Sequence, residues 1–193
     1  MLLILGSQSP RRAEIMGYFS LPFEQMNSGF DEESVHFNGD SKAYVTELSE
    51  SKAEVLAAKY PERPILTADT VVYRNGKIYN KPQDELEAIA MLNELAGGWH
   101  SVFTGVSLRL GNKHFSKVGE TQVLFNFLTK DEIQKYNSSL HLYDKAGSYQ
   151  LQGAGGIIVK EVKGCYYNVV GLPINVVREL LNEIGIDLWN YLK

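Results

Sequence analysis

One aspartate inside an apolar segment is the residue of this chain that most clearly suggests chemistry. Asp69 lies in the middle of residues 65–73, which are otherwise apolar apart from two threonines. Such a run is typical of a strand covered on both faces, where an unpaired carboxylate costs enough to stay protonated. We therefore interpret Asp69 as a functional residue. The alternative is an aspartate neutralised by a neighbouring Lys or Arg.

A phosphate site is predicted directly after the first apolar segment. Residues 2–5 suit a short buried strand and a helix is predicted from Arg11, so the turn between them leaves backbone N–H groups pointing at one spot. Ser7 and Ser9 add hydroxyl donors, and Arg11 and Arg12 add forked guanidinium groups that suit phosphate oxygens. A capped surface helix with two solvated arginines is the alternative, but the position after a buried strand favours phosphate binding. The string matches neither the Walker loop nor the G-x-G-x-x-G pattern.

Two lysines are expected near the same place. Lys52 lies on the apolar stripe of a helix predicted over residues 41–59, four residues from both Leu48 and Leu56. A snorkelling lysine explains that spacing equally well. The Asn75-Gly76 hairpin signal turns the chain back along its own strand and brings Lys81 toward Asp69, although a solvated turn lysine is the alternative.

Acidic and glycine-rich stretches supply the remaining candidates for a binding site. The run Asp31-Glu32-Glu33 follows an extended segment and is either a solvated turn or a source of ligands for a hard cation. Residues 143–156 are rich in small residues, which let the backbone approach a ligand closely. Gln152 within them carries a donor and an acceptor, as needed to bind the edge of a nucleobase. A connector without a ligand is an equal alternative.

Two residues that often carry chemistry are assigned to packing instead. The sequence pattern around His100 places no second histidine at a metal-ligand spacing, which favours a packing or hydrogen-bonding role. Cys165 follows Lys163-Gly164 and is expected on a strand as a buried, inert thiol.

The alternation of strands and helices predicts an α/β fold. Helices are expected over residues 11–19, 41–59, 84–96, 130–136 and 174–184. Extended segments are expected over residues 2–5, 23–30, 65–73, 77–79, 99–110, 113–116, 120–127, 157–160 and 166–170.

Length and composition limit the class of protein. The 193 residues contain no linker-like stretch, so one domain spanning residues 1–193 is expected, and a hydrophobic share of 44% is enough for a sizeable core. The net charge of −4 argues against nucleic acid as a partner. A single cysteine excludes an internal disulfide, and no apolar run has the length of a membrane span. A cytoplasmic protein that does not bind membranes is the default expectation.

Several motifs, in this order along the whole chain, resemble the Maf (septum formation inhibitor) family of nucleoside triphosphate pyrophosphatases. They are Ser7-Gln8-Ser9-Pro10-Arg11-Arg12, Ser51-Lys52-Ala53, Ala68-Asp69-Thr70-Val71-Val72, Lys81-Pro82, residues 100–106, Asp144-Lys145-Ala146-Gly147, Leu151-Gln152-Gly153 and Asn168-Val169-Val170-Gly171-Leu172-Pro173. The resemblance implies a long mixed central sheet with flanking helices and two lobes around a nucleotide-binding groove, similar to the inosine triphosphate pyrophosphatases. It also implies a homodimer.

The same resemblance implies an activity and roles for particular residues. The family hydrolyses a nucleoside triphosphate to the monophosphate and pyrophosphate with a divalent cation, Mg²⁺ or Mn²⁺. Asp69 matches the catalytic proton acceptor close to the metal, and Glu32 matches an acidic position that is a second candidate metal ligand. Arg12, Lys52 and Lys81 match basic residues that hold the phosphates.

The preferred substrate is also implied by the resemblance. Arg12, Thr70 and Gln152 together resemble the subgroup that acts on dTTP and UTP, with clearing of modified nucleotides as a further role. Leu151 departs from the commoner isoleucine, which we expect to be neutral. The alternative function is a regulator of cell division that binds nucleotide or protein without hydrolysis. Asp69 inside an apolar strand argues against a mere scaffold.

Overall fold

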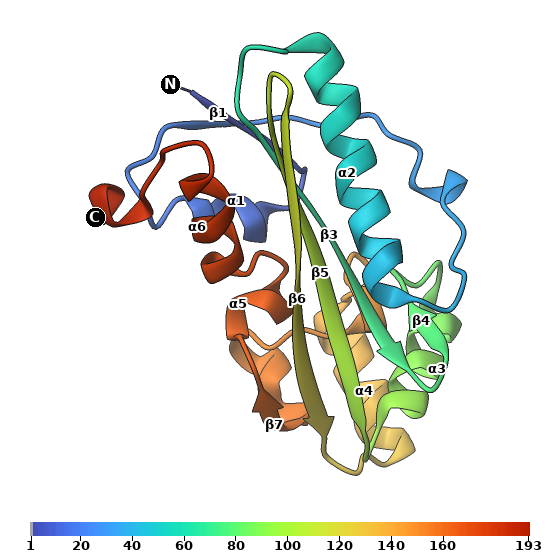
Figure 1. The fold of residues 1–193 in the computed structure, drawn as a ribbon. Helices are drawn as coiled ribbons and strands as arrows, with labels where there is room; N and C mark the ends of the chain where they lie inside the picture. Colours follow the sequence, from blue (N-terminus) through green and yellow to red (C-terminus); the bar gives the residue numbers. More distant parts are fainter. Residues whose placement is uncertain (1) are drawn as a thin grey trace.

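The computed structural model describes residues 2–193, within which seven strands form one mixed sheet (Figure 1). The strand order is β2-β1-β3-β5-β6-β7, and β4 also pairs with β3. The strands are β1 (Leu3–Gly6), β2 (Phe23–Gln25), β3 (Ile65–Arg74), β4 (Lys77–Tyr79), β5 (Trp99–Leu110), β6 (Lys113–Phe125) and β7 (Val159–Lys163). β1 runs parallel to β2 and β3, whereas β3, β5, β6 and β7 pair antiparallel in turn. The predicted α/β class with a long mixed sheet is confirmed.

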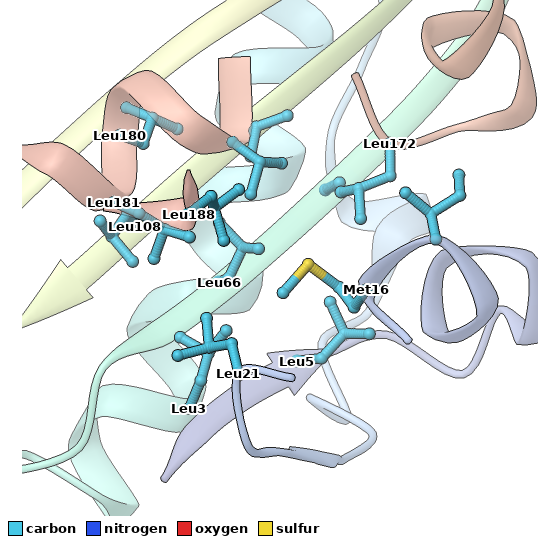
Figure 2. Packing of buried hydrophobic residues seen from close by; sticks show 14 of the residues in the cluster. Leu3, Leu5, Met16, Leu21, Leu66, Leu108, Leu172, Leu180, Leu181 and Leu188 are labelled. Carbon is cyan, nitrogen blue, oxygen red and sulfur yellow. The ribbon is translucent and has the colours of Figure 1, made fainter. Parts of the chain in front are cut away.

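Helices cover both faces of the long strands. They are α1 (Pro10–Met16), α2 (Ser41–Lys59), α3 (Glu85–Leu95), α4 (Lys130–Leu140), α5 (Tyr166–Val170) and α6 (Ile174–Asn182). α2 lies along one face of β3 and β5, while α1, α5 and α6 lie on the other side (Figure 1). The apolar cluster under α6 contains leucines from β1, β3, β5 and the C-terminal helices, together with Met16 of α1 (Figure 2). The alternating side chains of β3 thus face two different helical layers.

One edge of β3 is open in its middle. β1 pairs with β3 as far as Gly6 and Thr67, and β4 begins its pairing at Val72. Between these points, at residues 68–71, no strand of the described chain covers this edge. Asp69 and Thr70 lie in this gap, so side chains from both faces of the strand can reach one cleft at the carboxyl end of β1.

A glycine sets the distance between α2 and the sheet. Gly105 of β5 is the register partner of Asp69. A Cβ atom at Gly105 would lie 2.3 Å from the carbonyl oxygen of Val45 in α2, a contact that real side chains do not make. The missing side chain lets the backbone of α2 pass directly over the sheet, which brings Lys52 of the same helix to Asp69.

The structure corrects several predicted elements. Only β2 is a strand within the segment predicted as extended over residues 23–30. The two strands predicted over residues 113–116 and 120–127 are one long strand, β6, which ends at Phe125. Residues 157 and 158 belong to a 3₁₀ helix (Gly153–Ile158), so β7 begins later than predicted, and α4 is longer than predicted. α1 begins at Pro10 and ends at Met16, three residues before the predicted end.

The largest correction concerns residues 166–170, which are helix α5 and not a strand. The sequence Tyr-Tyr-Asn-Val-Val has high strand propensity, but tertiary hydrogen bonds override it. The backbone N–H of Cys165 donates to Thr121 Oγ1, and the Asn168 amide donates to Val102 and Thr121. Cys165 is consequently a partly exposed residue preceding a helix, not a buried strand residue.

Within residues 2–193, no helix is both long enough and apolar enough to cross a membrane.

Candidate active site

The open edge of β3 borders a cleft of about 870 Å³. Its wall combines the turn after β1, the segment before α2, the hairpin of β3 and β4, and the loop before β7. All ten residues predicted for the site line this cleft, namely Ser7, Ser9, Arg11, Arg12, Glu32, Lys52, Asp69, Thr70, Lys81 and Gln152. Segments far apart in the sequence therefore meet as expected, whereas the role of each residue stays a prediction.

Lys52 links two carboxylates at the floor of the cleft. Its Nζ atom lies 2.5 Å from Asp69 Oδ1 and 2.8 Å from Glu32 Oε1. The Lys52 side chain is 7% exposed and that of Asp69 12%, so the predicted cation partner of Asp69 is present and buried with it. The pair still borders the cleft and is not sealed inside the protein, which distinguishes it from a purely structural ion pair.

The surrounding charges keep Glu32 ionised. Burial alone raises the pKa of Glu32, but the ammonium groups of Lys52 and Lys81 and the guanidinium of Arg12 together lower that pKa below its ordinary value. Glu32 is thus the member of the Asp31-Glu32-Glu33 run that joins the Lys52 cluster. It lies in a 3₁₀ turn (Glu32–Ser34) whose first N–H groups are capped by Asp31, since the Asp31 carboxylate accepts from the N–H of Glu33.

Arg12 is held by three parts of the chain at once. Its Nε donates to the carbonyl of Gly171 at 2.7 Å, while its two Nη atoms donate to Ser7 Oγ at 3.2 Å and Thr70 Oγ1 at 3.0 Å. Burial lowers the pKa of Arg12, with Asp69 opposing the shift, but an arginine stays charged at neutral pH. The structure shows that the Arg12 guanidinium is oriented by these three hydrogen bonds, while its predicted role in phosphate binding stays a prediction.

The outer part of the cleft contains further charges. Arg11 pairs with Asp144 at 3.4 Å, and Lys145 pairs with the same carboxylate at 2.6 Å. Lys81 is exposed on the cleft wall after the Asn75-Gly76 hairpin, which forms as predicted. Gln152 is partly exposed at the start of the 3₁₀ helix before β7.

The donor set suits a divalent cation only if the substrate completes it. Across residues 2–193, no three His, Cys, Asp or Glu side chains gather into a metal-binding group. Glu32 and Asp69, both within 3 Å of the Lys52 ammonium, offer two carboxylates. Mg²⁺ commonly binds through one or two carboxylates together with phosphate oxygens and water, so these residues fit an ion that arrives with a triphosphate.

The sequence interpretation missed the connection of two buried polar residues to the site. Thr104 and Asn168 are fully buried and connect Thr70 to helix α5, but neither lines the cleft. A threonine or an asparagine in the sequence does not by itself indicate such a connection. The strand pairing of residues 65–73 with 99–110 in the observed register would have placed Thr104 opposite Thr70.

His100 anchors the loop that carries Gln152. It is buried, and its Nε2 lies 2.9 Å from the hydroxyl of Tyr149, with the rings of Phe125 and Tyr149 packed edge-on against it. The predicted packing and hydrogen-bonding role is confirmed. Burial, assisted by the positive charge of Arg74, lowers the pKa of His100 from 6.5 to about 3.

The neutral state of His100 predicts acid sensitivity. Because the folded protein holds the His100 pKa below its unfolded value, protonation favours unfolding, and stability falls as pH drops from 6.5 toward 3. Each pH unit below 6.5 lowers the free energy of unfolding by about 1.4 kcal/mol. Between pH 7 and pH 5 the free energy of unfolding of the wild type should therefore fall by about 2 kcal/mol more than that of His100→Gln. Urea unfolding of both proteins at each pH measures the difference. Equal losses in the two proteins would contradict a neutral buried histidine.

Solved structures give a fold-level comparison. The Ham1 protein of Staphylococcus aureus matches with a TM-score of 0.47 and 12% identity over 100% of this chain and 94% of that chain. A dITP/XTP pyrophosphatase of Mycobacterium abscessus matches with a TM-score of 0.41 and 13% identity over 65% and 74% of the two chains.

Curated relatives are much closer in sequence. A dTTP/UTP pyrophosphatase of Chlamydia felis is 46% identical over 191 residues, which cover 98% of this chain and 97% of that protein. A dTTP/UTP pyrophosphatase of Clostridium novyi is 43% identical over 97% of this chain and 100% of that protein. The sequence model of the family described as "Maf-like protein" matches residues 2–184. Near-complete coverage at this identity leads to one conclusion: the chain belongs to the Maf-like protein family.

Proposed function

We propose that this protein hydrolyses nucleoside triphosphates, above all dTTP and UTP, to the monophosphate and pyrophosphate. The full-length relatives named dTTP/UTP pyrophosphatase support the substrate class. The observation that carries the proposal is the placement of the Asp69 carboxylate at a cleft whose wall also presents Arg11, Arg12, Lys52 and Lys81. A triphosphate carries several negative charges, which such a wall of cations can neutralise.

In the proposed reaction a water attacks the α-phosphorus of the bound nucleotide. A new P–O bond forms, the bond from the α-phosphorus to the bridging oxygen breaks, and pyrophosphate leaves with that electron pair. Asp69 orients the water and accepts its proton. Lys52 keeps the Asp69 carboxylate in position at 2.5 Å, and the basic side chains of the wall stabilise the charge on the phosphoryl oxygens.

A divalent cation, Mg²⁺ or Mn²⁺, is part of the proposal. When bound, it would neutralise part of the negative charge of the triphosphate. Glu32 and Asp69 would hold it, and their shared contact with Lys52 supports this assignment because it shows that both carboxylates reach one point.

Preference for a uracil or thymine base is assigned to the region of Arg12, Thr70 and Gln152. The Gln152 amide carries both donor and acceptor groups on the rim of the cleft. Location in the cytoplasm, the default expectation from the sequence, is a further proposal. Assembly as a homodimer and a role in septum formation are proposals that rest on the family resemblance.

A panel of purified nucleotides tests reaction and base preference together. We expect pyrophosphate and the monophosphate from dTTP and UTP at kcat/KM values at least about tenfold above those for ATP and GTP. EDTA should abolish this release, and added Mg²⁺ or Mn²⁺ should restore it. Orthophosphate in place of pyrophosphate, or binding without turnover at any metal concentration, would contradict the proposal.

A further inference from the structure

A pair of threonines lies across the β3–β5 ladder beside the cleft. Thr70 and Thr104 are register partners, and their hydroxyl oxygens are 2.9 Å apart. Thr70 is partly exposed and lines the cleft, whereas Thr104 is fully buried and does not reach it. Thr104 in turn lies 3.0 Å from the carbonyl oxygen of Asn168 in α5. The two hydroxyls therefore form a continuous chain from the cleft into the protein.

The direction of this hydrogen-bond chain is fixed by its two ends. A carbonyl oxygen can only accept, so the single proton of the Thr104 hydroxyl must point to Asn168. Otherwise two oxygens would face each other in the buried interior with no proton between them. Thr104 consequently accepts from Thr70. At the other end, an Nη group of Arg12 can only donate, so Thr70 accepts from Arg12.

The inner end of the chain is held rigidly. The Asn168 side chain is fully buried and donates to the carbonyl of Val102 at 2.9 Å and to Thr121 Oγ1 at 3.1 Å. It fits against β6 because residue 119 is glycine, where a Cβ atom would lie 2.5 Å from Asn168 Oδ1. The helix that supplies the Asn168 carbonyl also leads to Gly171, whose carbonyl accepts from Arg12 Nε.

We propose that Thr104 is a positioning residue that fixes the Thr70 hydroxyl as a hydrogen-bond acceptor toward the bound nucleotide. The proton of the Thr70 hydroxyl points to Thr104, and one lone pair of the Thr70 oxygen accepts from Arg12. One lone pair of that oxygen is left to accept a hydrogen bond from the ligand. Each Nη of Arg12 carries two N–H groups, and one on each is used by Ser7 or Thr70. The cleft thus presents an acceptor next to a donor.

This arrangement of an acceptor next to a donor determines which chemical group can bind beside Thr70. Phosphate oxygens offer only acceptors and would face the lone pair of Thr70 unfavourably. The imide edge of uracil or thymine offers an N–H donor next to a carbonyl acceptor, which complements Thr70 and Arg12. Cytosine has the same size but carries an acceptor at N3 and a donor at N4, so it reverses this pattern. The inference rests on the proposed function and deepens it, because it assigns Arg12 and Thr70 to the base, leaves Arg11, Lys52 and Lys81 to the phosphates, and gives a buried residue control over the choice between uracil and cytosine.

The test compares Thr104→Val with Thr104→Ser. Valine keeps the shape but removes the hydroxyl, so the Thr70 proton loses its inward acceptor and Thr70 can rotate. We expect the kcat/KM of Thr104→Val for UTP to fall roughly tenfold, mainly through KM, with less than about twofold change for CTP, whose base has the reversed pattern. Thr104→Ser should stay within about twofold of wild type for both substrates.

A buried hydroxyl on the same strand gives the matched control. Ser107 is fully buried on β5, contacts His114 and does not line the cleft. Ser107→Ala removes a comparable hydroxyl and should leave the ratio of UTP to CTP activity unchanged. If Thr104→Val does not fold, Thr104→Cys takes its place in the comparison, because a thiol is a weak hydrogen-bond donor and a weak acceptor.

A double-mutant cycle tests whether Thr104 acts through Thr70. If it does, adding Thr104→Val to Thr70→Val should lower kcat/KM for UTP by less than about twofold beyond Thr70→Val alone. An unchanged UTP to CTP ratio in Thr104→Val, or multiplicative effects in the cycle, would overturn the assignment of Thr104 while leaving the proposed function intact. A wild-type protein that releases no pyrophosphate from UTP or dTTP would overturn both.

Discussion

Asp69→Asn is expected to fold like the wild type and to lose roughly a thousandfold of its pyrophosphate release from dTTP or UTP. The amide cannot accept a proton from the attacking water, and it removes the charge that would help hold a cation. Folding should survive because Lys52 keeps a second carboxylate, Glu32, at 2.8 Å, and the asparagine oxygen can still accept from the ammonium. The loss should therefore appear in kcat and leave the melting temperature within a few degrees of wild type.

The measurement is kcat and KM by pyrophosphate detection, together with thermal unfolding of the same preparations. Glu179→Gln is a suitable control, since it also neutralises a carboxylate that is paired with a lysine, here Lys117 at 2.6 Å on the surface. That variant should show wild-type kinetics. An Asp69→Asn protein with wild-type turnover would show that another group accepts the proton.

The sequence was informative where chemistry depends on a local pattern. Asp69 stood out because a carboxylate is unusual inside an apolar strand, and Lys52 because it shares the apolar stripe of its helix. The structure places the two side chains in contact, so the lysine on the helix is the cation partner that the buried aspartate requires. Lys81 was positioned by a two-residue hairpin, another signal that is local in sequence.

The features that escaped prediction depend on contacts between distant segments. The gap in the edge of β3 exists because β1 stops at Gly6 and β4 ends opposite Val72, and no local pattern gives the register of three strands. Helix α5 was mistaken for a strand because its propensity is overruled by the hydrogen bonds of Asn168. The role of Thr104 follows from both features together, so it is visible only in the folded protein.

Lys52→Met is expected to damage stability and catalysis together, unlike Asp69→Asn. The substitution keeps an unbranched side chain of similar length but removes the ammonium that lies between Asp69 and Glu32. Two carboxylates are then left near each other without their cation, and breaking such a buried pair costs about 3 kcal/mol at neutral pH. We expect turnover to fall by roughly a hundredfold or more, because the cation also stabilises charge on the phosphates. Lys52→Arg keeps the charge and should recover part of the stability.

The pH dependence separates this electrostatic loss from a packing defect. In the wild type burial raises the pKa of Glu32, but the positive charges of Lys52, Lys81 and Arg12 together outweigh burial and lower that pKa, so the Glu32–Lys52 interaction stabilises the fold above the unfolded pKa and is lost as pH falls. Without Lys52, the charges that oppose burial are weaker and the pKa of Glu32 rises from its wild-type value. The stability difference between wild type and Lys52→Met should therefore be largest at pH 7 and shrink toward pH 4, where protonated carboxylates need no cation.

Urea unfolding of both proteins from pH 7 to pH 4 measures this difference. The contribution of His100 is the same in both proteins and cancels. A difference that is constant from pH 7 to pH 4 would mean that the methionine variant is destabilised by poor packing, and that Lys52 does not hold the two carboxylates by charge.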